Sequence, residues 1–225
     1  KDEVIVPNFT FAAVINSVLY ANATPVIVDV DKDKWTLDAN EIIKNITKKT
    51  KAIIAVHIYG NPCDLVRLQN ICKKNKIFLI EDCAEAIGSK YKNKLVGTFG
   101  DCGVFSFFAN KTISTGEGGM VIFKDKKHYL RAKLLRDHGM SKNKRYYHDE
   151  VGFNYRMTNL QAAVGVAQLE KFNEIIKRKR NIFKHYYNLL SKNFNIKLQK
   201  NEKFSQNTYW SVALIVNLKK FSYKK

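Results

Sequence analysis

Short runs of consecutive apolar residues alternate along the chain with longer segments of helical periodicity. Such runs are typical of strands that are buried on both faces of a sheet, because they lack the polar alternation of a half-exposed strand. Strands are predicted at 4–6, 26–30, 52–56, 78–80, 104–107 and 120–123. Between them, residues 11–21 and 64–75 carry apolar side chains at helical spacing. This alternation predicts an α/β fold with a mostly parallel sheet.

The connection between the last two predicted strands contains several glycines and has no full helix, so we expect these two strands to be antiparallel. Thr158 is a predicted N-cap, and one long helix is expected from there towards Leu190. We predict a large α/β domain over residues 1–170, and a spine helix with the start of a smaller α+β domain over 171–225.

Both ends of the sequence fall on predicted core strands. The chain starts at Lys1 rather than at Met and enters an apolar run within three residues, and residues 209–216 form another apolar run close to the end. A complete domain does not normally begin and end in this way. We therefore expect the 225 residues to be a piece of a longer protein.

The formal net charge of +19, from 39 Lys and Arg against 20 Asp and Glu, raises the alternative of a nucleic-acid or polyanion-binding module. More than half of this excess falls in residues 161–225, and Lys dominates over Arg, which is the side chain that reads phosphates and bases in bidentate fashion. The basic run 177–180 is typical of a solvated helix face. We therefore expect no nucleic-acid partner.

The cysteines, histidines and apolar stretches exclude further classes of protein. The four cysteines and five histidines lack the short paired spacings of a zinc site, which predicts no metal centre and free thiols in a reducing compartment. No stretch approaches the roughly 18 apolar residues of a membrane span, and no secretion signal opens the chain. We predict a cytoplasmic protein without a membrane partner.

Three segments that come after predicted strands carry candidate chemistry, because ligands collect at the carboxyl ends of strands in open α/β sheets. The first, 80–85, reads IEDCAE and places carboxylates where an apolar strand leaves the core. The second, 105–111, ends in Lys111, an amine nucleophile candidate beside an aromatic strand. The third, 115–119, reads TGEGG, in which glycines let the backbone pass close to a bound group. Each signal alone has an ordinary structural explanation.

Taken together in this order and spacing, the three segments resemble the DegT/DnrJ/EryC1/StrS family. Further matching stretches are DEVIVPNFTF at 2–11, PVIVD at 25–29, HIYGNPCD at 57–64, RDHG at 136–139 and GFNYRM at 152–157. The resemblance covers essentially the whole chain. It implies the fold type I large domain of pyridoxal-phosphate-dependent transferases. The family's SGTxAL phosphate loop, which would precede residue 2, is not in the sequence.

The resemblance also implies roles for individual residues. Lys111 matches the lysine that bonds the pyridoxal 5′-phosphate aldehyde, and Asp82 matches the acid that pairs with the pyridine nitrogen. Glu85 falls near the ring hydroxyl, and Ser106 matches a phosphate ligand. The two remaining cofactor contacts are Phe11, which matches the aromatic that stacks on the ring, and Asn154, which matches a phosphate ligand from a neighbouring subunit and so implies a homodimer.

The expected activity is amino transfer, with glutamate as donor, to a nucleotide-linked 4-keto-6-deoxy sugar, first of all GDP-4-keto-6-deoxymannose, for surface polysaccharide or glycan synthesis. A UDP or dTDP keto sugar is the alternative within the family. Lys111 argues against the related dehydratase branch, which has His at that position. Two hypotheses lie outside this activity: the polyanion-binding module, and a relative that acts only as a partner subunit.

Overall fold

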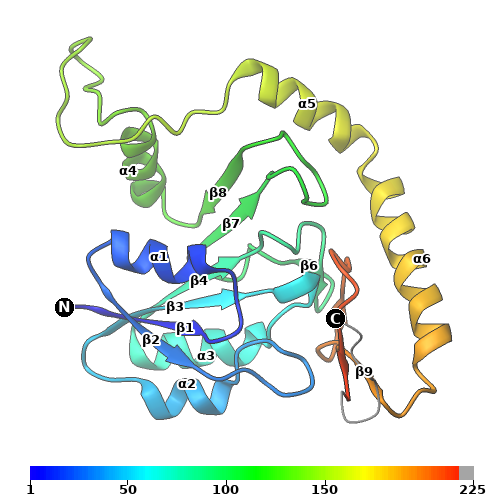
Figure 1. Ribbon diagram of the computed structural model, residues 1–225. Helices are drawn as coiled ribbons and strands as arrows, with labels where there is room; N and C mark the ends of the chain where they lie inside the picture. The colour runs from blue at the N-terminus through cyan, green and yellow to red at the C-terminus, as the bar shows by residue number, and fades with distance from the viewer. Residues whose placement is uncertain (218–225) are drawn as a thin grey trace, which may run out of the picture.

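The computed structural model describes residues 1–217 of the chain, so the last part of the predicted second domain, 218–225, lies outside the described residues. A six-stranded sheet forms the centre, with the strand order β2-β1-β3-β4-β7-β8 (Figure 1). These strands are β1 (Glu3–Pro7), β2 (Thr24–Val28), β3 (Thr50–Val56), β4 (Phe78–Asp82), β7 (Cys102–Ser106) and β8 (Gly119–Phe123).

The pairing of the strands agrees with the sequence pattern. All neighbours from β2 to β7 pair in parallel, and β8 runs antiparallel to β7. The predicted α/β fold with a mostly parallel sheet is therefore confirmed, as is the antiparallel partner at the Gly-rich connection. The run expected at 209–216 is shorter than predicted, because only β11 (Leu214–Val216) forms a strand there.

Helices cover both faces of the sheet, which explains why its strands are continuously apolar. Helix α1 (Ala12–Tyr20) lies on one face, whereas α2 (Ala39–Asn45) and α3 (Leu65–Asn75) lie on the other (Figure 1). Adjacent residues of one strand serve different cores: Ile53 packs in the cluster that includes Leu68 and Ile42, and Ile54 packs in the cluster of Val14 and Val18.

The expected long helix is instead two helices, α5 (Asn159–Glu170) and α6 (Phe172–Leu190), which meet at Lys171. Thr158 caps α5 as predicted, within a capping box completed by Gln161. The two helices pack at different places, because the Gln168 side chain accepts a hydrogen bond from the Ser114 amide while Phe172 lies against Gly88. A third helix, α4 (Lys126–Arg136), precedes them.

The segment after α6 returns to the large sheet region. This segment contains three short strands, and two of them, β9 (Ile196–Leu198) and β11, pair with each other. The third, β10 (Ser205–Gln206), pairs with β5 (Lys90–Tyr91). Strand β5 also pairs with β6 (Lys94–Leu95). The division into domains at residue 170 stays a prediction. Within residues 1–217, no helix combines the length and apolar character needed to cross a membrane.

Candidate active site

The predicted site residues lie where neighbouring parallel strands end. Asp82 is the last residue of β4 and Ser106 is the last residue of β7, and the two strands pair directly, with Asp82 opposite Val104. Lys111 comes after β7 in the turn that leads to the glycine-containing segment and β8. The topology therefore brings the acidic strand end and the lysine to one edge of the sheet.

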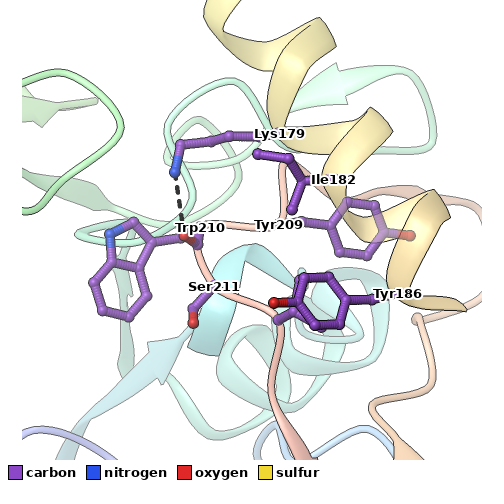
Figure 2. A pocket seen from close by; sticks show the side chains of 7 residues that line it. Lys179, Ile182, Tyr186, Tyr209, Trp210 and Ser211 are labelled. Atoms are coloured by element: carbon purple, nitrogen blue, oxygen red, sulfur yellow. Dashed lines mark hydrogen bonds between the residues drawn. The ribbon is translucent and has the colours of Figure 1, made fainter. Parts of the chain in front are cut away.

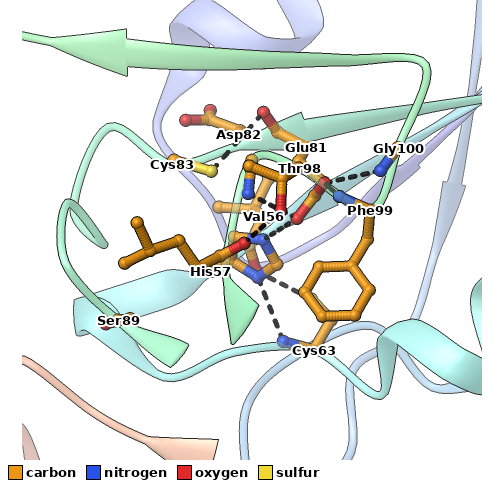
Figure 3. Close-up of polar contacts among 12 residues, drawn as sticks. Val56, His57, Cys63, Glu81, Asp82, Cys83, Ser89, Thr98, Phe99 and Gly100 are labelled. Atoms are coloured by element: carbon orange, nitrogen blue, oxygen red, sulfur yellow. Dashed lines mark hydrogen bonds and ion pairs between the residues drawn. The ribbon is translucent and has the colours of Figure 1, made fainter. Parts of the chain in front are cut away.

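Glu81, which precedes Asp82, is a fully buried carboxylate with an unusually complete set of donors. The backbone amides of Gly97, Phe99 and Gly100 donate to its two oxygens at 2.6–2.7 Å, and the imidazole of His57 lies 3.1 Å away (Figure 3). Burial opposes its ionisation, but these hydrogen bonds outweigh burial and lower the pKa of Glu81 below its usual value. Glu81 thus ties the 97–100 loop to β4, one residue before Asp82.

The hydrogen bonds of His57 fix its tautomer. Its Nδ1 accepts the backbone N–H of Cys63 at 3.0 Å, so the ring proton is on Nε2 and is donated to Glu81. The His57 backbone N–H in turn donates to the Asp82 carbonyl. Cys83 lies close enough for a three-residue metal cluster with His57 and Glu81. However, burial raises the pKa of Cys83 to about 11, which keeps it a thiol, and the other two side chains are already engaged in hydrogen bonds.

Asp82 differs sharply from its neighbour. Among the described residues, its side chain has one backbone donor, the amide of Ala84 at 2.9 Å. Burial raises the pKa of Asp82, while that hydrogen bond and the positive charge of Lys111 act in the opposite direction. A half-buried carboxylate with free acceptor positions is suited to a cationic N–H partner.

Lys111 lies in a small polar and aromatic niche. Its Nζ is 3.7 Å from Oε1 of Glu85, and both side chains are about 15% exposed. The other Glu85 oxygen accepts the backbone N–H of Tyr59 at 2.7 Å. Burial raises the pKa of Glu85, against the effects of Tyr59 N–H and Lys111. The structure therefore brings the Lys111 amine next to Glu85 and near enough to Asp82 for its charge to act on that carboxyl group, while the roles of the three residues stay predictions.

Ser106 is placed at the start of the β7–β8 connection. Its hydroxyl accepts the Phe108 amide at 3.3 Å, and its backbone pairs with Gly119. Gly118 has a φ of 152°, and a Cβ there would come within 2.5 Å of the Thr115 hydroxyl, so this turn requires glycine. Ser106 and the glycine-containing segment thus lie side by side.

The two remaining predicted residues are exposed. Phe11 is the N-cap of α1 with 77% of its surface exposed, and Asn154 pairs with Asp137 in the connection between α4 and α5. Within residues 1–217, no described contact joins either of them to Lys111, Asp82 or Glu85. Their roles as a ring-stacking residue and as a phosphate ligand for the neighbouring subunit remain predictions.

The sequence did not indicate two aromatic residues of this niche, which are Tyr59 and Trp210. Their rings stack with 6.2 Å between the ring centroids. Trp210 comes from the C-terminal segment, and its ring centroid is 4.6 Å from the Lys111 amine. Tyr59 is in the matching stretch HIYGNPCD, but a single sequence gives no signal for its left-handed backbone, with φ of 56°.

A family model described as the DegT/DnrJ/EryC1/StrS aminotransferase family matches residues 1–225. The chain belongs to this family. The predicted resemblance is thereby confirmed, and it agrees with the arrangement of strand-end acid, lysine and glycine turn described above. Solved structures of aminotransferases also superpose on this chain, which agrees with the predicted fold type.

Three relatives illustrate the range of the family. GDP-perosamine synthase of Escherichia coli O157:H7 is 49% identical over 216 residues, covering 95% of this chain and 58% of the relative. A UDP-N-acetyl-3-dehydro-alpha-D-glucosamine 3-aminotransferase of Acidithiobacillus ferrooxidans is 44% identical over 164 residues, covering 72% and 44%. A putative sugar aminotransferase of Streptococcus pneumoniae, solved in its PLP form, has a TM-score of 0.89 at 28% identity, covering 96% and 60%. The chain therefore spans about 58% of the length of the first of these relatives.

Proposed function

We propose that the protein of which this chain is part is a pyridoxal-phosphate-dependent aminotransferase for nucleotide-linked keto sugars. The observation that carries the proposal is the placement of the Lys111 amine beside Glu85 and Asp82 at the carboxyl ends of β4 and β7. The similarity to GDP-perosamine synthase supports GDP-4-keto-6-deoxymannose as the acceptor sugar and glutamate as the amino donor.

The residues present fit pyridoxal 5′-phosphate. Asp82 keeps free acceptor positions in a half-buried setting, whereas the adjacent Glu81 has both oxygens engaged, so of these two carboxylates it is Asp82 that can accept a pyridinium N–H. Lys111 would hold the aldehyde, Ser106 the phosphate, and Glu85 would lie towards the ring hydroxyl. Phe11 and Asn154 would complete the set, the latter from a second subunit of a homodimer. The bound cofactor would supply an electron sink.

The chain's own groups account for the proton movements that amino transfer requires. Lys111 carries a primary amine that can take a proton from one carbon of the bound substrate and return it to another position. Glu85, held by the Tyr59 amide, keeps the amine on one side of the niche. Asp82 stabilises positive charge at the end of β4, where burial leaves little water to do so.

The experiment that tests this function is a product assay with the intact protein. Incubation with GDP-4-keto-6-deoxymannose and glutamate should yield the 4-amino sugar nucleotide, identified by its mass, and Lys111→Met should abolish the conversion. Parallel reactions with UDP- and dTDP-linked keto sugars test the second candidate, which the 44% identity to a UDP-sugar aminotransferase supports. Conversion of none of the keto sugars, or full turnover by Lys111→Met, would contradict the proposal.

A further inference from the structure

The indole ring of Trp210 lies against the reactive amine proposed above. The Nζ of Lys111 is 4.6 Å from the ring centroid, which is within the range of about 6 Å that defines a cation–π contact. Glu85 contacts the same amine with its carboxylate. Lys111 is therefore held between a carboxylate from the segment after β4 and an aromatic face from the C-terminal segment.

Trp210 itself is anchored by all of its polar groups. Its backbone N–H donates to the Tyr59 carbonyl at 3.0 Å, and its carbonyl accepts the amine of Lys179 in α6 at 3.2 Å (Figure 2). Its indole N–H donates to the carbonyl of Asn110 at 2.9 Å. Asn110 directly precedes Lys111, so the ring is fixed to the same backbone that carries the lysine.

Tyr59 links the two sides of this niche. Its amide orients Glu85, its carbonyl accepts the Trp210 amide, and its ring stacks in parallel with the indole at an interplanar angle of 5°. Figure 2 shows the indole of Trp210 on the opposite side of its segment from Tyr186 and Tyr209. The ring is thus directed to the lysine and not into the contact with α6.

We propose that Trp210 is a positioning residue for Lys111, delivered by the C-terminal segment to complete the amine site. A lysine side chain has four flexible carbons, so a free amine samples many rotamers. The aromatic face attracts the ammonium and excludes those rotamers that point away from Glu85. This inference rests on the proposed function, because Lys111 is the reacting amine there.

The chain contains two tryptophans, which makes the contact directly measurable. Trp35 contacts Phe9 and Tyr59 in edge-to-face geometry, and its indole N–H has no hydrogen-bond partner among the described atoms, so Trp35→Phe keeps an aromatic ring and breaks no described hydrogen bond. In cofactor-free intact protein in which Trp35 and any tryptophan outside residues 1–225 are replaced by Phe, adding K111M should shift the fluorescence emission of Trp210, because a charge beside the ring is removed. In the matched W210F background, K111M should leave the emission of Trp35 unchanged.

A second pair of variants separates the aromatic face from the hydrogen bonds. Trp210→Leu removes the ring face, whereas Trp210→Phe keeps an aromatic ring but loses the indole N–H. We expect the rate at which pyridoxal 5′-phosphate adds to Lys111 to fall about fivefold in W210L, because without the ring face the side chain samples rotamers that point away from Glu85. In W210F we expect a rate close to that of the parent protein.

The outcomes distinguish failure of this inference from failure of the proposed function. An unchanged emission of Trp210 on K111M, or equal addition rates in W210L and the parent, would overturn the positioning role. Slow addition in both W210L and W210F with equally lowered melting temperatures would also overturn it, since that pattern indicates a purely structural residue. If pyridoxal 5′-phosphate does not add to Lys111 in the parent protein, the proposed function fails, while the fluorescence pair still decides whether the contact exists.

Discussion

Two adjacent carboxylates at the end of β4 have opposite properties because of their hydrogen bonds. Glu81 is fully buried and accepts hydrogen bonds from three backbone amides and from the His57 imidazole, and its pKa is lowered. The Asp82 carboxylate accepts one hydrogen bond from a backbone amide among the described residues, and burial raises its pKa. The first carboxylate fixes the loop and strand, and the second is left free to accept a hydrogen bond from a ligand.

Replacing Glu81 by Gln should therefore destabilise the fold strongly. The amide keeps the size but turns one acceptor into a donor that faces backbone N–H groups, which should cost about 3 kcal/mol of unfolding free energy. Denaturant titration measures this loss. The matched control is Glu41→Gln, whose carboxylate makes a surface pair with Lys44, and whose change should be below about 0.5 kcal/mol. Equal effects of the two variants would refute the structural role of Glu81.

The same network predicts a dependence on pH. Because the pKa of Glu81 is lower in the folded state than in the unfolded chain, its contribution to stability is complete above an unfolded pKa of roughly 4.3. That contribution is lost as the pH falls through the lower folded value. The difference in unfolding free energy between the parent protein and E81Q should therefore shrink below about pH 4. A difference that stays constant at low pH would contradict this assignment.

At the residue scale, the sequence predicted the features that depend on strand position. Asp82, Glu85 and Lys111 were expected at one site because each comes after a predicted strand and because the family resemblance assigns all three to one cofactor. The Lys111 amine lies 3.7 Å from Glu85 and its charge acts on Asp82, whereas the roles of the three residues stay predictions. His57 and Trp210 were not assigned roles, because their contacts depend on how loops fold. No local pattern distinguishes a Trp that contacts a lysine from one that fills a core.

At the element scale, the turn after β3 determines how the C-terminal segment approaches the site. Gly60 has a φ of +93°, and a Cβ there would lie 2.7 Å from Asn207 Oδ1 and 2.9 Å from Thr208 Oγ1. The segment 207–210 crosses directly over this glycine and continues into Trp210. The approach of the indole to Lys111 therefore depends on the missing side chain at position 60.

Gly60→Ala should consequently loosen that segment. Backbone strain and steric clash together should cost about 3 kcal/mol, and amide hydrogen exchange over residues 199–210 should accelerate. Gly116→Ala is the matched control, because it also has a positive φ, +78°, but open space around its Cβ. The control should lose only about 1 kcal/mol and leave the exchange of 199–210 unchanged. Similar losses in both variants would mean that strain, not close approach, explains Gly60.

The elements themselves were predictable to different degrees. Each of the predicted sheet strands exists, because short apolar runs rich in β-branched residues favour strands that are buried on both faces of a sheet. The break between α5 and α6 was not predicted, since helical periodicity continues through Lys171 and the bend serves two separate packing sites. The basic run 177–180 showed no sign of its actual contacts, in which Lys179 and Arg180 bind backbone carbonyls of Trp210 and Asn207.

At the scale of the whole molecule, the net charge of +19 now has a structural context. Part of the basic run in α6 holds the C-terminal segment, and Arg178 pairs with Glu174 one turn earlier. These contacts are those of a helix that docks a neighbouring segment. The proposed chemistry lies at the carboxyl edge of the sheet, and the basic run reaches it only through Lys179, which holds the segment that brings Trp210 to Lys111.

Lys111 is proposed to be the amine that bonds pyridoxal 5′-phosphate, and chemical trapping of that bond identifies the lysine involved. The amine nitrogen bonds the aldehyde carbon, the carbonyl oxygen leaves as water, and borohydride then reduces the carbon–nitrogen double bond to a stable link. Treating the intact protein in this way and sequencing its peptides by mass spectrometry should locate the label at Lys111, with Lys111→Met unlabelled and Lys124→Met labelled as in the parent. Label at other lysines only, or undiminished specific labelling of Lys111→Met, would contradict the claim.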